Sequence, residues 1–391
     1  MKTRAEGRHA SHEAQPHAYL SHRGRYAALA LCLLAATGTS LPAGPAKKSE
    51  TILDVLPLEQ ARDKSWFQQI QARNPASLAN GFLDVTLYNG WQGHPVDPTG
   101  RRDSTKALQK AVVDARDGAL ALFFPEGTYL LSDTLNCMKT GTRTVTWKHA
   151  RKRTVRNNEK YRVIALIGST KGQRPVLKLR DRAAGFADKS APKPVVIVWN
   201  QSDPKKMRIP CKDAVIAHGN GFNMVFRGID IDVGRGNAGA VGLCMTGAQG
   251  ASIENVKVDA TGGFAGFYYM PGAGAGTANI EVIGGDYGFY GAGSPCGHIT
   301  AGVFRDQAVR SIHSYGAWHL GFIGCEFTKQ TAPILTLQAC DWNTVGGSMF
   351  FKDCRIEIAS DNGKPIIDNG LGKLVYLKDV YAKGAAAVIE D

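Results

Sequence analysis

The sequence lacks the short motifs that mark metal, nucleotide and membrane-spanning sites. Its eight cysteines form no CxxC pair and follow no cysteine–histidine spacing typical of zinc, so a structural metal has no support. The glycine-rich stretch at 271–276 opens no helix and has no Lys-Ser/Thr pair after it, so it is not a phosphate loop. No apolar run reaches the about 20 residues that a membrane-spanning helix needs.

The composition is that of a folded protein. Hydrophobic residues make up 43% and charged residues 21% of the 391 positions, which excludes wholesale disorder. Glycine, with 45 residues, exceeds its usual share of about 7%. Aromatic and β-branched residues lie among these glycines, and this combination favours a β-rich fold with many turns.

The first 46 residues have the features of an export signal. Arg23 and Arg25 precede an apolar run over residues 26–36, and small residues follow it. This order is typical of a cleaved signal peptide, with an interior amphipathic segment as the alternative. We therefore expect residues 1–46 to be removed and the protein to be secreted, periplasmic or extracellular, without an integral membrane segment in the mature chain.

The chain is basic. Its formal net charge is +13, and +10 remains when the first 46 residues are left out. Such an excess favours an acidic partner over a neutral one. The most basic stretch, residues 139–162, is either a solvated loop or a wall that attracts an anionic polymer. Export and the lack of a recognition motif argue against nucleic acid as a partner.

A four-residue pattern recurs from about residue 222. Each copy has a small or turn-forming residue, an inward residue, a variable residue and an apolar residue. Consecutive variable residues are 27, 29, 17, 23, 29 and 26 positions apart. Short strands that return at such intervals predict parallel coils stacked into a solenoid rather than a hairpin meander. The seven variable residues are Asp230, Lys257, Asp286, Val303, Glu326, Arg355 and Tyr381.

The sequence therefore predicts an all-β fold, a single right-handed parallel β-helix. Apolar residues at helical spacing over residues 103–117, after an N-cap at Asp103 or Ser104, predict one helix that caps its N-terminal end. We expect residues 47–85 to form an N-terminal arm and residues 86–391 to form the β-helix domain.

Seven cysteines remain after the leader, so at least one is unpaired. Cys137 and Cys211 flank the basic stretch and are either bridged or buried as free thiols. Cys325 and Cys354 hold the same inward position in two copies of the pattern. Because parallel neighbours point their Cβ atoms the same way, we expect a buried pair without a disulfide.

Two segments resemble the opening of pectate-lyase-superfamily β-helix proteins. Residues 100–111 read GRRDSTKALQKA and residues 123–129 read FFPEGTY, similar to the family's GDGxTDDTxAIQxA and FPxGxY. Two departures occur: Thr99-Gly100-Arg101 stands for GDG, and Arg102 for the first Asp of DDT. Residues 248–256 also resemble part of the first β-helix of laminarin-degrading exo-β-1,3-glucanases. Those enzymes hold their catalytic acid in a second β-helix, so no catalytic residue carries over.

The resemblance implies a carbohydrate-active β-helix, and the superfamily holds lyases, hydrolases, epimerases and phage tailspikes. Asp286 and Glu326 are expected two coils apart, about 9–10 Å at the usual strand spacing. Inverting glycosidases hold their carboxyl groups about 6.5–9.5 Å apart. The two carboxylates are therefore either a catalytic pair or members of a surface charge ladder.

A second group of candidates lies between residues 294 and 342. His313 and His319 are candidate general bases for β-elimination. Aromatic rings stack on sugars and cations bind uronate carboxylates, although each side chain also has a structural interpretation. The candidate substrate-binding residues are Arg305, Asp306, Tyr315, Trp318, Lys329 and Trp342.

We expect a secreted protein that binds and cleaves a polysaccharide, acidic ones included, as a glycoside hydrolase or a polysaccharide lyase. The alternatives are a non-catalytic glycan-binding or surface β-helix, as in adhesins and tailspikes, and a subunit completed by homo-oligomerisation. No cofactor is expected. Asp230 and Asp232 are the nearest candidates for a calcium site.

Overall fold

A computed structural model of the chain describes residues 81–93, 96–139, 144–148, 154–158, 164–200, 221–272, 274–291, 297–315, 319–331, 333–338, 347–359, 362–370, 372, 374–385 and 387–390. The chain divides into two units, residues 1–55 and 56–391, and every described residue belongs to the second. The predicted export signal and most of the predicted arm lie outside the described residues, so both stay predictions.

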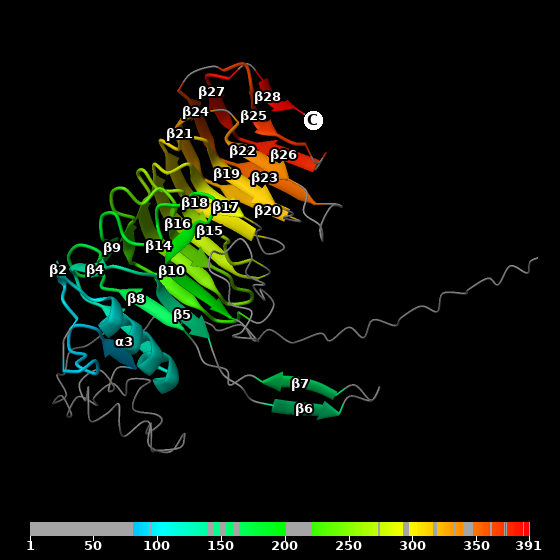
Figure 1. The fold of residues 1–391 in the computed structure, drawn as a ribbon. Coiled ribbons are helices and arrows are strands. Elements are labelled where there is room, and N and C mark those ends of the chain that lie inside the picture. The colour runs from blue at the N-terminus through cyan, green and yellow to red at the C-terminus, as the bar shows by residue number, and fades with distance from the viewer. Residues whose placement is uncertain are drawn as a thin grey trace, which may run out of the picture. The chain divides into compact units, whose positions relative to one another are not determined.

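Parallel strands form two large sheets, and the 17-stranded sheet contains two columns of strands (Figure 1). The first column contains β1 (Phe82–Asp84), β3 (Ala121–Phe124), β8 (Ala165–Gly168), β11 (Val225–Arg227), the first halves of β14 (Ser252–Asp259), β16 (Gly276–Ile283) and β18 (Gly297–Arg305), β20 (His319–Ile323), β23 (Ser348–Lys352) and β26 (Leu374–Lys378). The second column contains β2 (Thr99–Asp103), β4 (Thr128–Leu131), β9 (Val176–Leu179), β12 (Asp230–Asp232), the second halves of β14, β16 and β18, β21 (Glu326–Gln330), β24 (Arg355–Ile358) and β27 (Tyr381–Lys383).

The other large sheet, here called the nine-strand sheet, is the third side of each coil. It contains β5 (Leu135–Lys139), β10 (Lys193–Asn200), β13 (Ala240–Met245), β15 (Ala265–Tyr268), β17 (Tyr287–Gly291), β19 (Arg310–Tyr315), β22 (Leu335–Gln338), β25 (Pro365–Asp368) and β28 (Ala387–Glu390). The chain passes through the first column, the second column and the nine-strand sheet in turn. This order repeats from coil to coil, so the predicted right-handed parallel β-helix is confirmed.

A left-handed residue turns the chain between the first and second columns. Seven such residues have φ angles between 50° and 67°, a conformation that Gly, Asn and Asp adopt at the lowest cost. Six of them are the turn-forming residues of the predicted pattern. The seven are Gly228, Asn255, Asn279, Ala301, Gly324, Asp353 and Asp379.

The third copy of the predicted pattern is wrong. Glu281, not Asp286, pairs with Lys257 on one side and Val303 on the other. Counting from Glu281 changes the two irregular intervals of 29 and 17 residues into 24 and 22. Asp286 instead lies just before β17, because Gly284 and Gly285, with φ angles of 66° and 80°, turn the chain toward the nine-strand sheet.

Apolar side chains fill the interior as stacked columns. Val256 pairs with Ile280, and Arg355 N–H donates to the carbonyl of Cys325, which brings Cys325 beside Cys354. Ile229, Val256, Cys325 and Cys354 are all at most 3% exposed, as predicted for inward residues. Full burial of such side chains contributes about 1.5–3 kcal/mol for each Val or Ile.

Three described cysteines are buried and form no disulfide: Cys137, Cys325 and Cys354. The predicted unbridged pair of Cys325 and Cys354 is confirmed. Burial raises the pKa of the Cys137 thiol, and this residue forms no disulfide. Cys137 therefore has the second of its two predicted states, a buried thiol rather than a disulfide. Its proposed partner Cys211 lies outside the described residues.

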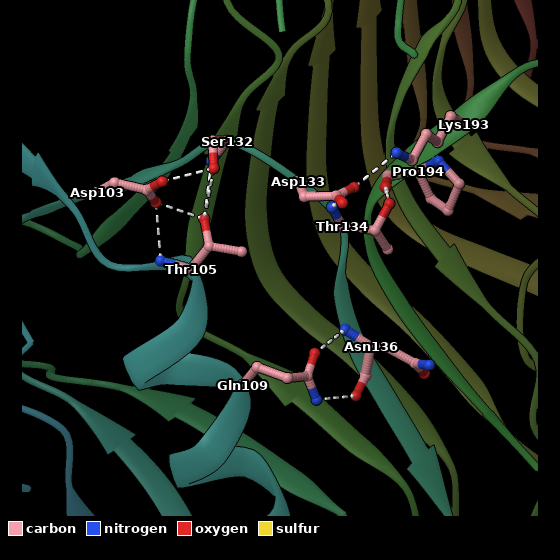
Figure 2. Close-up of polar contacts among 9 residues, drawn as sticks. All are labelled: Asp103, Thr105, Gln109, Ser132, Asp133, Thr134, Asn136, Lys193 and Pro194. Carbon is pink, nitrogen blue, oxygen red and sulfur yellow. Dashed lines mark hydrogen bonds and ion pairs between the residues drawn. The ribbon is translucent and has the colours of Figure 1, made fainter. Parts of the chain in front are cut away.

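Helix α3 (Thr105–Gly118) is close to the predicted capping helix. Figure 2 shows its start, where the Asp103 carboxylate accepts hydrogen bonds from the Thr105 backbone N–H at 2.9 Å and the Ser132 hydroxyl at 2.5 Å. The Ser104 side chain makes no capping hydrogen bond, so Asp103 does the capping. No helix within the described residues has the length and apolar character needed to cross a membrane.

Helix α3 also covers the open edge of β5. The Gln109 amide accepts from Asn136 N–H and donates to the Asn136 carbonyl, both at 2.8 Å (Figure 2). A neighbouring strand would make the same two bonds. Gln109 therefore satisfies backbone groups that an uncovered edge strand would offer to other chains.

Candidate functional site

The four predicted catalytic residues do not share one face of the coil. Glu326 begins β21 in the second column, and His319 begins β20 in the first. His313 lies in β19 of the nine-strand sheet, and Asp286 lies just before β17 of the same sheet. The expected column pairing of Asp286 with Glu326 is wrong, because Glu281 holds the place in the second column that Asp286 was given.

The second column carries a charge ladder. Arg174 Nε lies 2.8 Å from Asp230 Oδ1, Lys178 Nζ lies 2.9 Å from Asp232 Oδ2, and Arg305 is ion-paired with Glu281. Opposite charges on neighbouring strands neutralise one another here. Asp286, which the ladder interpretation included, is not part of this ladder, because it lies before β17 and pairs with Lys189.

The two calcium candidates, Asp230 and Asp232, are therefore each bound by a cationic side chain. Within the described part of the chain, no three His, Cys, Asp or Glu side chains gather as a metal site would require.

Several predicted substrate-binding residues lie away from the nine-strand sheet. Arg305 ends β18, and Lys329 Nζ lies 3.8 Å from Asp306 Oδ1. Asp306 and Lys329 both have left-handed backbones, with φ angles of 60° and 54°. The predicted residues Trp318 and Trp342 lie outside the described residues, and only the backbone of Tyr315 is described.

The outer face of the nine-strand sheet carries an aromatic cluster. Tyr290 and His313 are paired in register and stack with ring centroids 4.9 Å apart and planes 13° apart. Tyr287 lies 4.7 Å from Tyr290 and 5.6 Å from His313, again between ring centroids. The members of this aromatic cluster are Phe264, Tyr268, Tyr269, Tyr287, Tyr290 and His313.

The aromatic cluster continues into an apolar cluster that is separate from the interior core and includes Phe264 and Tyr268. This apolar cluster also contains Ile197, Trp199, Val241, Cys244 and Ala265, each at most 2% exposed. The whole of β13 is buried, so its two faces are both covered by apolar contacts. This sheet is therefore unlike the second column, whose outer face is charged.

Glycines let the nine-strand sheet approach the second column closely. A Cβ atom on Gly266 would lie 2.5 Å from Val282 Cγ1, and one on Gly288 would lie 2.5 Å from Phe304. Each glycine is followed by an inward Phe and an outward Tyr, so Gly-Phe-Tyr occurs at 266–268 and at 288–290. This repeat was the sequence signal that could have revealed the aromatic cluster.

Polar groups continue along the same face. Lys189 Nζ lies 2.6 Å from Asp286 Oδ2, which leaves the Asp286 side chain 17% exposed. Arg310 Nη1 donates to Thr336 Oγ1, and Thr336 Oγ1 in turn lies 3.5 Å from Asp368 Oδ2. The buried Nε of Arg310 has no hydrogen-bond acceptor among the described residues.

Asp286 and Asp368 are far apart on this face. Three strand intervals separate β17 from β25, which is about 14 Å at the usual spacing of 4.8 Å. Glycosidase carboxyl pairs are about 5–9.5 Å apart. These two carboxylates therefore do not form such a pair. Asp368 is also paired in register with Glu390 on β28.

The residues of this face that the sequence analysis did not single out are those that only strand register brings together. Tyr287, Tyr290, Arg310, Thr336 and Asp368 lie on four consecutive strands, and only the pairing of those strands brings them to one face. Of the predicted catalytic residues, His313 and Asp286 lie on this face.

Comparison with known proteins finds solved structures of low similarity. No curated protein matches the chain. ORF18 of Geobacillus virus E2 is 13% identical with a TM-score of 0.37, covering 84% of this chain and 65% of that one, so this chain spans less than two thirds of it. The catalytic unit of a GH87 α-1,3-glucanase from Streptomyces thermodiastaticus is 12% identical, with a TM-score of 0.27 and coverage of 80% and 70%. PfbA, a surface adhesin of Streptococcus pneumoniae, is 9% identical, with a TM-score of 0.25 and coverage of 79% and 93%.

The family match is more extensive. Residues 95–329 match the family model described as rhamnogalacturonase A/epimerase, pectate lyase-like. That span is more than half of the chain, and it includes helix α3 and the strands up to β21. The resemblance seen in residues 100–111 and 123–129 is thereby confirmed. The chain belongs to the rhamnogalacturonase A/epimerase, pectate-lyase-like family.

Proposed function

We propose that this protein binds a polysaccharide along the outer face of the nine-strand sheet and cleaves it by β-elimination. The observation that carries the proposal is the aromatic cluster, which continues in register into the Arg310–Thr336–Asp368 line. Tyr268, Tyr290, His313, Thr336 and Asp368 lie on five neighbouring strands. These span about 19 Å, the length of about four sugar rings.

Binding would use the aromatic rings and the Arg310 guanidinium. Sugar rings would pack against the partly exposed apolar surface of Tyr287 and Tyr290. Arg310 has a buried Nε–H without an acceptor, and a uronate carboxylate placed beside it would supply one. The substrate class is therefore a uronate-containing glycan.

Cleavage would use His313 as the general base. His313 takes the proton from C5 of the uronate, a C4–C5 double bond forms, and the C4–O bond breaks. The leaving oxygen takes a proton from water. Arg310, three residues before His313 on the same strand, neutralises the carboxylate whose charge would otherwise oppose removal of the C5 proton.

Asp286 stays a candidate for contact with the substrate, because it borders the same face beside Lys189. Hydrolysis is less well supported than elimination, since Asp286 and Asp368 lie about 14 Å apart along the coils. We also propose that residues 1–46 direct export, which N-terminal sequencing of the protein recovered outside the cytoplasm would test.

The test is a screen of acidic and neutral polysaccharides, followed both by absorbance at 235 nm and by reducing ends. Elimination predicts absorbance from a uronate-containing glycan. His313→Ala should lower the rate at least about 100-fold, as expected for loss of a general base. His319→Ala is the matched control on the first column and should keep the parent rate. Reducing ends without absorbance would replace elimination by hydrolysis.

A non-catalytic glycan-binding protein is the second candidate. His313 is only 7% exposed, and Asp286 is already held by Lys189, which suits a binding surface as well as a catalytic one. Binding by calorimetry without either product would favour this candidate. Equal rates for the parent, His313→Ala and Arg310→Gln would contradict the catalytic roles given above.

A further inference from the structure

The last coil of the described β-helix, formed by β26, β27 and β28, exposes apolar side chains. Among the described residues five large hydrophobic side chains are exposed, and four of them lie in this coil, with exposed fractions from 43% to 72%. The four are Leu374, Tyr376, Tyr381 and Val388. Scattered apolar residues are ordinary on a protein surface, but a group confined to one coil indicates an interaction surface.

The three strands of this coil each have an open edge. In the strand pairing of the described residues, β26 pairs with β23 alone, β27 with β24 alone and β28 with β25 alone. All three lie at the red end of the solenoid in Figure 1. At the other end, the Gln109 amide makes both backbone hydrogen bonds to Asn136 on the edge strand β5. An edge that is left open can pair with a strand of another chain.

The open edge of β27 is centred on Ala382. The Tyr381 N–H donates to the Cys354 carbonyl at 2.9 Å, toward the preceding coil. Successive residues of a strand direct their backbone groups to opposite edges, so the N–H and C=O of Ala382 point to the open edge. Two residues that face each other in this way across an antiparallel pair exchange two hydrogen bonds. Ala382 therefore suits pairing with Ala382 of a second copy, across a two-fold axis.

The same two-fold axis places β26 of one copy against β28 of the other. Val375 and Ile389 both pack against the interior core, so they must oppose each other if the two cores are to be continuous. In that antiparallel register, Tyr376 comes opposite Val388, and both are exposed hydrophobic side chains. Aromatic and β-branched residues are a favourable cross-strand pair. This end of the solenoid is therefore complementary to itself, as a two-fold interface requires.

The charge of the last coil also suits a second copy. Residues 374–390 contain two Lys, one Asp and one Glu, a net charge of zero, whereas the whole chain carries +13. Two copies of a basic chain therefore repel each other least at this end. In the pairing of β27 with its copy, Lys383 comes opposite Tyr381, so the two lysines do not face each other. The Tyr381 ring already has the Arg355 guanidinium 5.5 Å from its centroid.

We propose that this end of the β-helix is a homodimer interface, in which β27 pairs antiparallel with its own copy and β26 with β28 of the other subunit. The inference does not rest on the proposed function. A second copy is the favoured partner because it offers three open edges in the matching arrangement. The coil has sixteen described residues, 374–385 and 387–390, fewer than the about 20–30 that each partner contributes to a standard interface. The dimer should therefore dissociate on dilution.

The test is sedimentation equilibrium of the full chain between about 1 and 100 μM, where interfaces of modest affinity dissociate. Tyr376→Lys and Val388→Lys each place a charge in the apolar contact, and Tyr376→Lys/Val388→Glu places opposite charges across it. Ala382→Pro removes an N–H from the open edge and none that faces β24. Leu87→Lys is the matched control, because Leu87 is the fifth exposed large hydrophobic residue and follows β1 in the first coil. Thermal unfolding shows that each variant is folded.

The inference predicts a dimer whose dissociation constant rises at least about tenfold in Tyr376→Lys, Val388→Lys and Ala382→Pro. The variant with opposite charges should recover most of this loss, and Leu87→Lys should dimerise as the parent does. A parent that stays monomeric at 100 μM, or a dimer that folded Val388→Lys and Ala382→Pro leave unchanged, would overturn the inference. Recovery in the double variant would support the proposed register, and a double variant as weak as the single variants would contradict it.

Discussion

The outer faces of the second column and of the nine-strand sheet differ in how their polar groups are satisfied. On the second column, acidic and basic side chains of neighbouring coils pair with one another, as Arg174 does with Asp230 and Lys178 with Asp232. On the nine-strand sheet, rings lie against rings. The buried Nε atoms of Arg310 on that sheet and of Arg305 on the second column both have no hydrogen-bond acceptor among the described residues, so the rings are what distinguish the nine-strand sheet.

The difference shows how a repeating fold distinguishes an ordinary charged surface from a candidate binding site. Neighbouring coils are about 4.8 Å apart, so any column of alternating charges neutralises itself without a ligand. A column of aromatic rings has no such charges to neutralise. The chemistry of the nine-strand face is therefore better completed by a ligand that offers both apolar sugar faces and carboxylates.

The largest expected effect is a difference in rate between two histidine variants. His313→Ala removes the proposed base on the nine-strand sheet, and His319→Ala removes a histidine on the first column. His313→Ala should lower the rate of 235 nm product formation at least about 100-fold, because the proton at C5 then has no acceptor. His319→Ala, on the first column, should change the rate less than twofold. If both variants behave alike, the two faces do not differ as the comparison requires.

Arg310→Gln should have the next largest effect. The variant should raise KM for uronate-containing glycans about tenfold, since one charge-assisted hydrogen bond to a carboxylate contributes about 1.5–3 kcal/mol. Arg310→Lys is the informative second variant. It keeps the charge but loses the planar guanidinium, so it should recover only part of the affinity that Arg310→Gln loses. The same KM for Arg310→Gln and the parent would remove Arg310 from the site.

Asp97 can be compared with the paired carboxylates of the second column, because its own carboxylate is buried. The Thr99 backbone N–H, at 3.0 Å, and further hydrogen bonds from the Thr99 hydroxyl and Arg102 N–H lower the pKa of Asp97 to about 2 from 3.8. A lowered pKa means that its stabilising effect is present above about pH 4 and is lost as the pH falls toward 2.

The expected consequence is that Asp97→Asn lowers the free energy of unfolding by about 2 kcal/mol at neutral pH, with a smaller difference at pH 2 to 3. Denaturant titrations of the parent and the variant at both values of pH measure this. A stability difference that does not shrink in acid would mean that the charge of Asp97 is not what stabilises the fold.

The smallest effect is expected on the charge ladder. Glu281→Gln breaks a half-exposed ion pair with Arg305 and should cost about 1 kcal/mol of stability or less, with glycan binding unchanged. Added salt should reduce even that cost, because exposed pairs are screened. A large loss of glycan binding in Glu281→Gln would place part of the site on the second column.

The fold was largely predictable from the sequence because its corners need particular residues. Gly228, Asn255 and Asp353 each mark a left-handed bend, and the inward residue follows directly. The third copy failed because residues 279–282 and 284–287 both fit the four-residue pattern. Only the pairing of β16 with β18 shows that the first of these segments is in register.

The site was less predictable, because strand register rather than local sequence decides which side chains become neighbours. Coil lengths vary, so residues at one level of the nine-strand sheet are separated by unequal intervals: Tyr268, Tyr290, His313 and Thr336 are 22, 23 and 23 residues apart, whereas Asp368 follows after 32. His313 and Asp286 were identified by their chemistry. Arg310 and Tyr290 were missed because nothing in their local sequence reveals their neighbours.

The central claim is that glycan binds the nine-strand face rather than the charged second column, and two tyrosines test it most directly. Calorimetry with a polysaccharide that the parent binds compares Tyr290→Ala with Tyr381→Ala, the latter removing a ring that is 52% exposed on the second column. Tyr290→Phe and thermal unfolding of each variant control for loss of the fold. We predict that Tyr290→Ala weakens binding about tenfold or more, through loss of ring stacking, while Tyr290→Phe and Tyr381→Ala bind as the parent does. Unweakened binding by a folded Tyr290→Ala, or a larger loss in Tyr381→Ala, would contradict the claim.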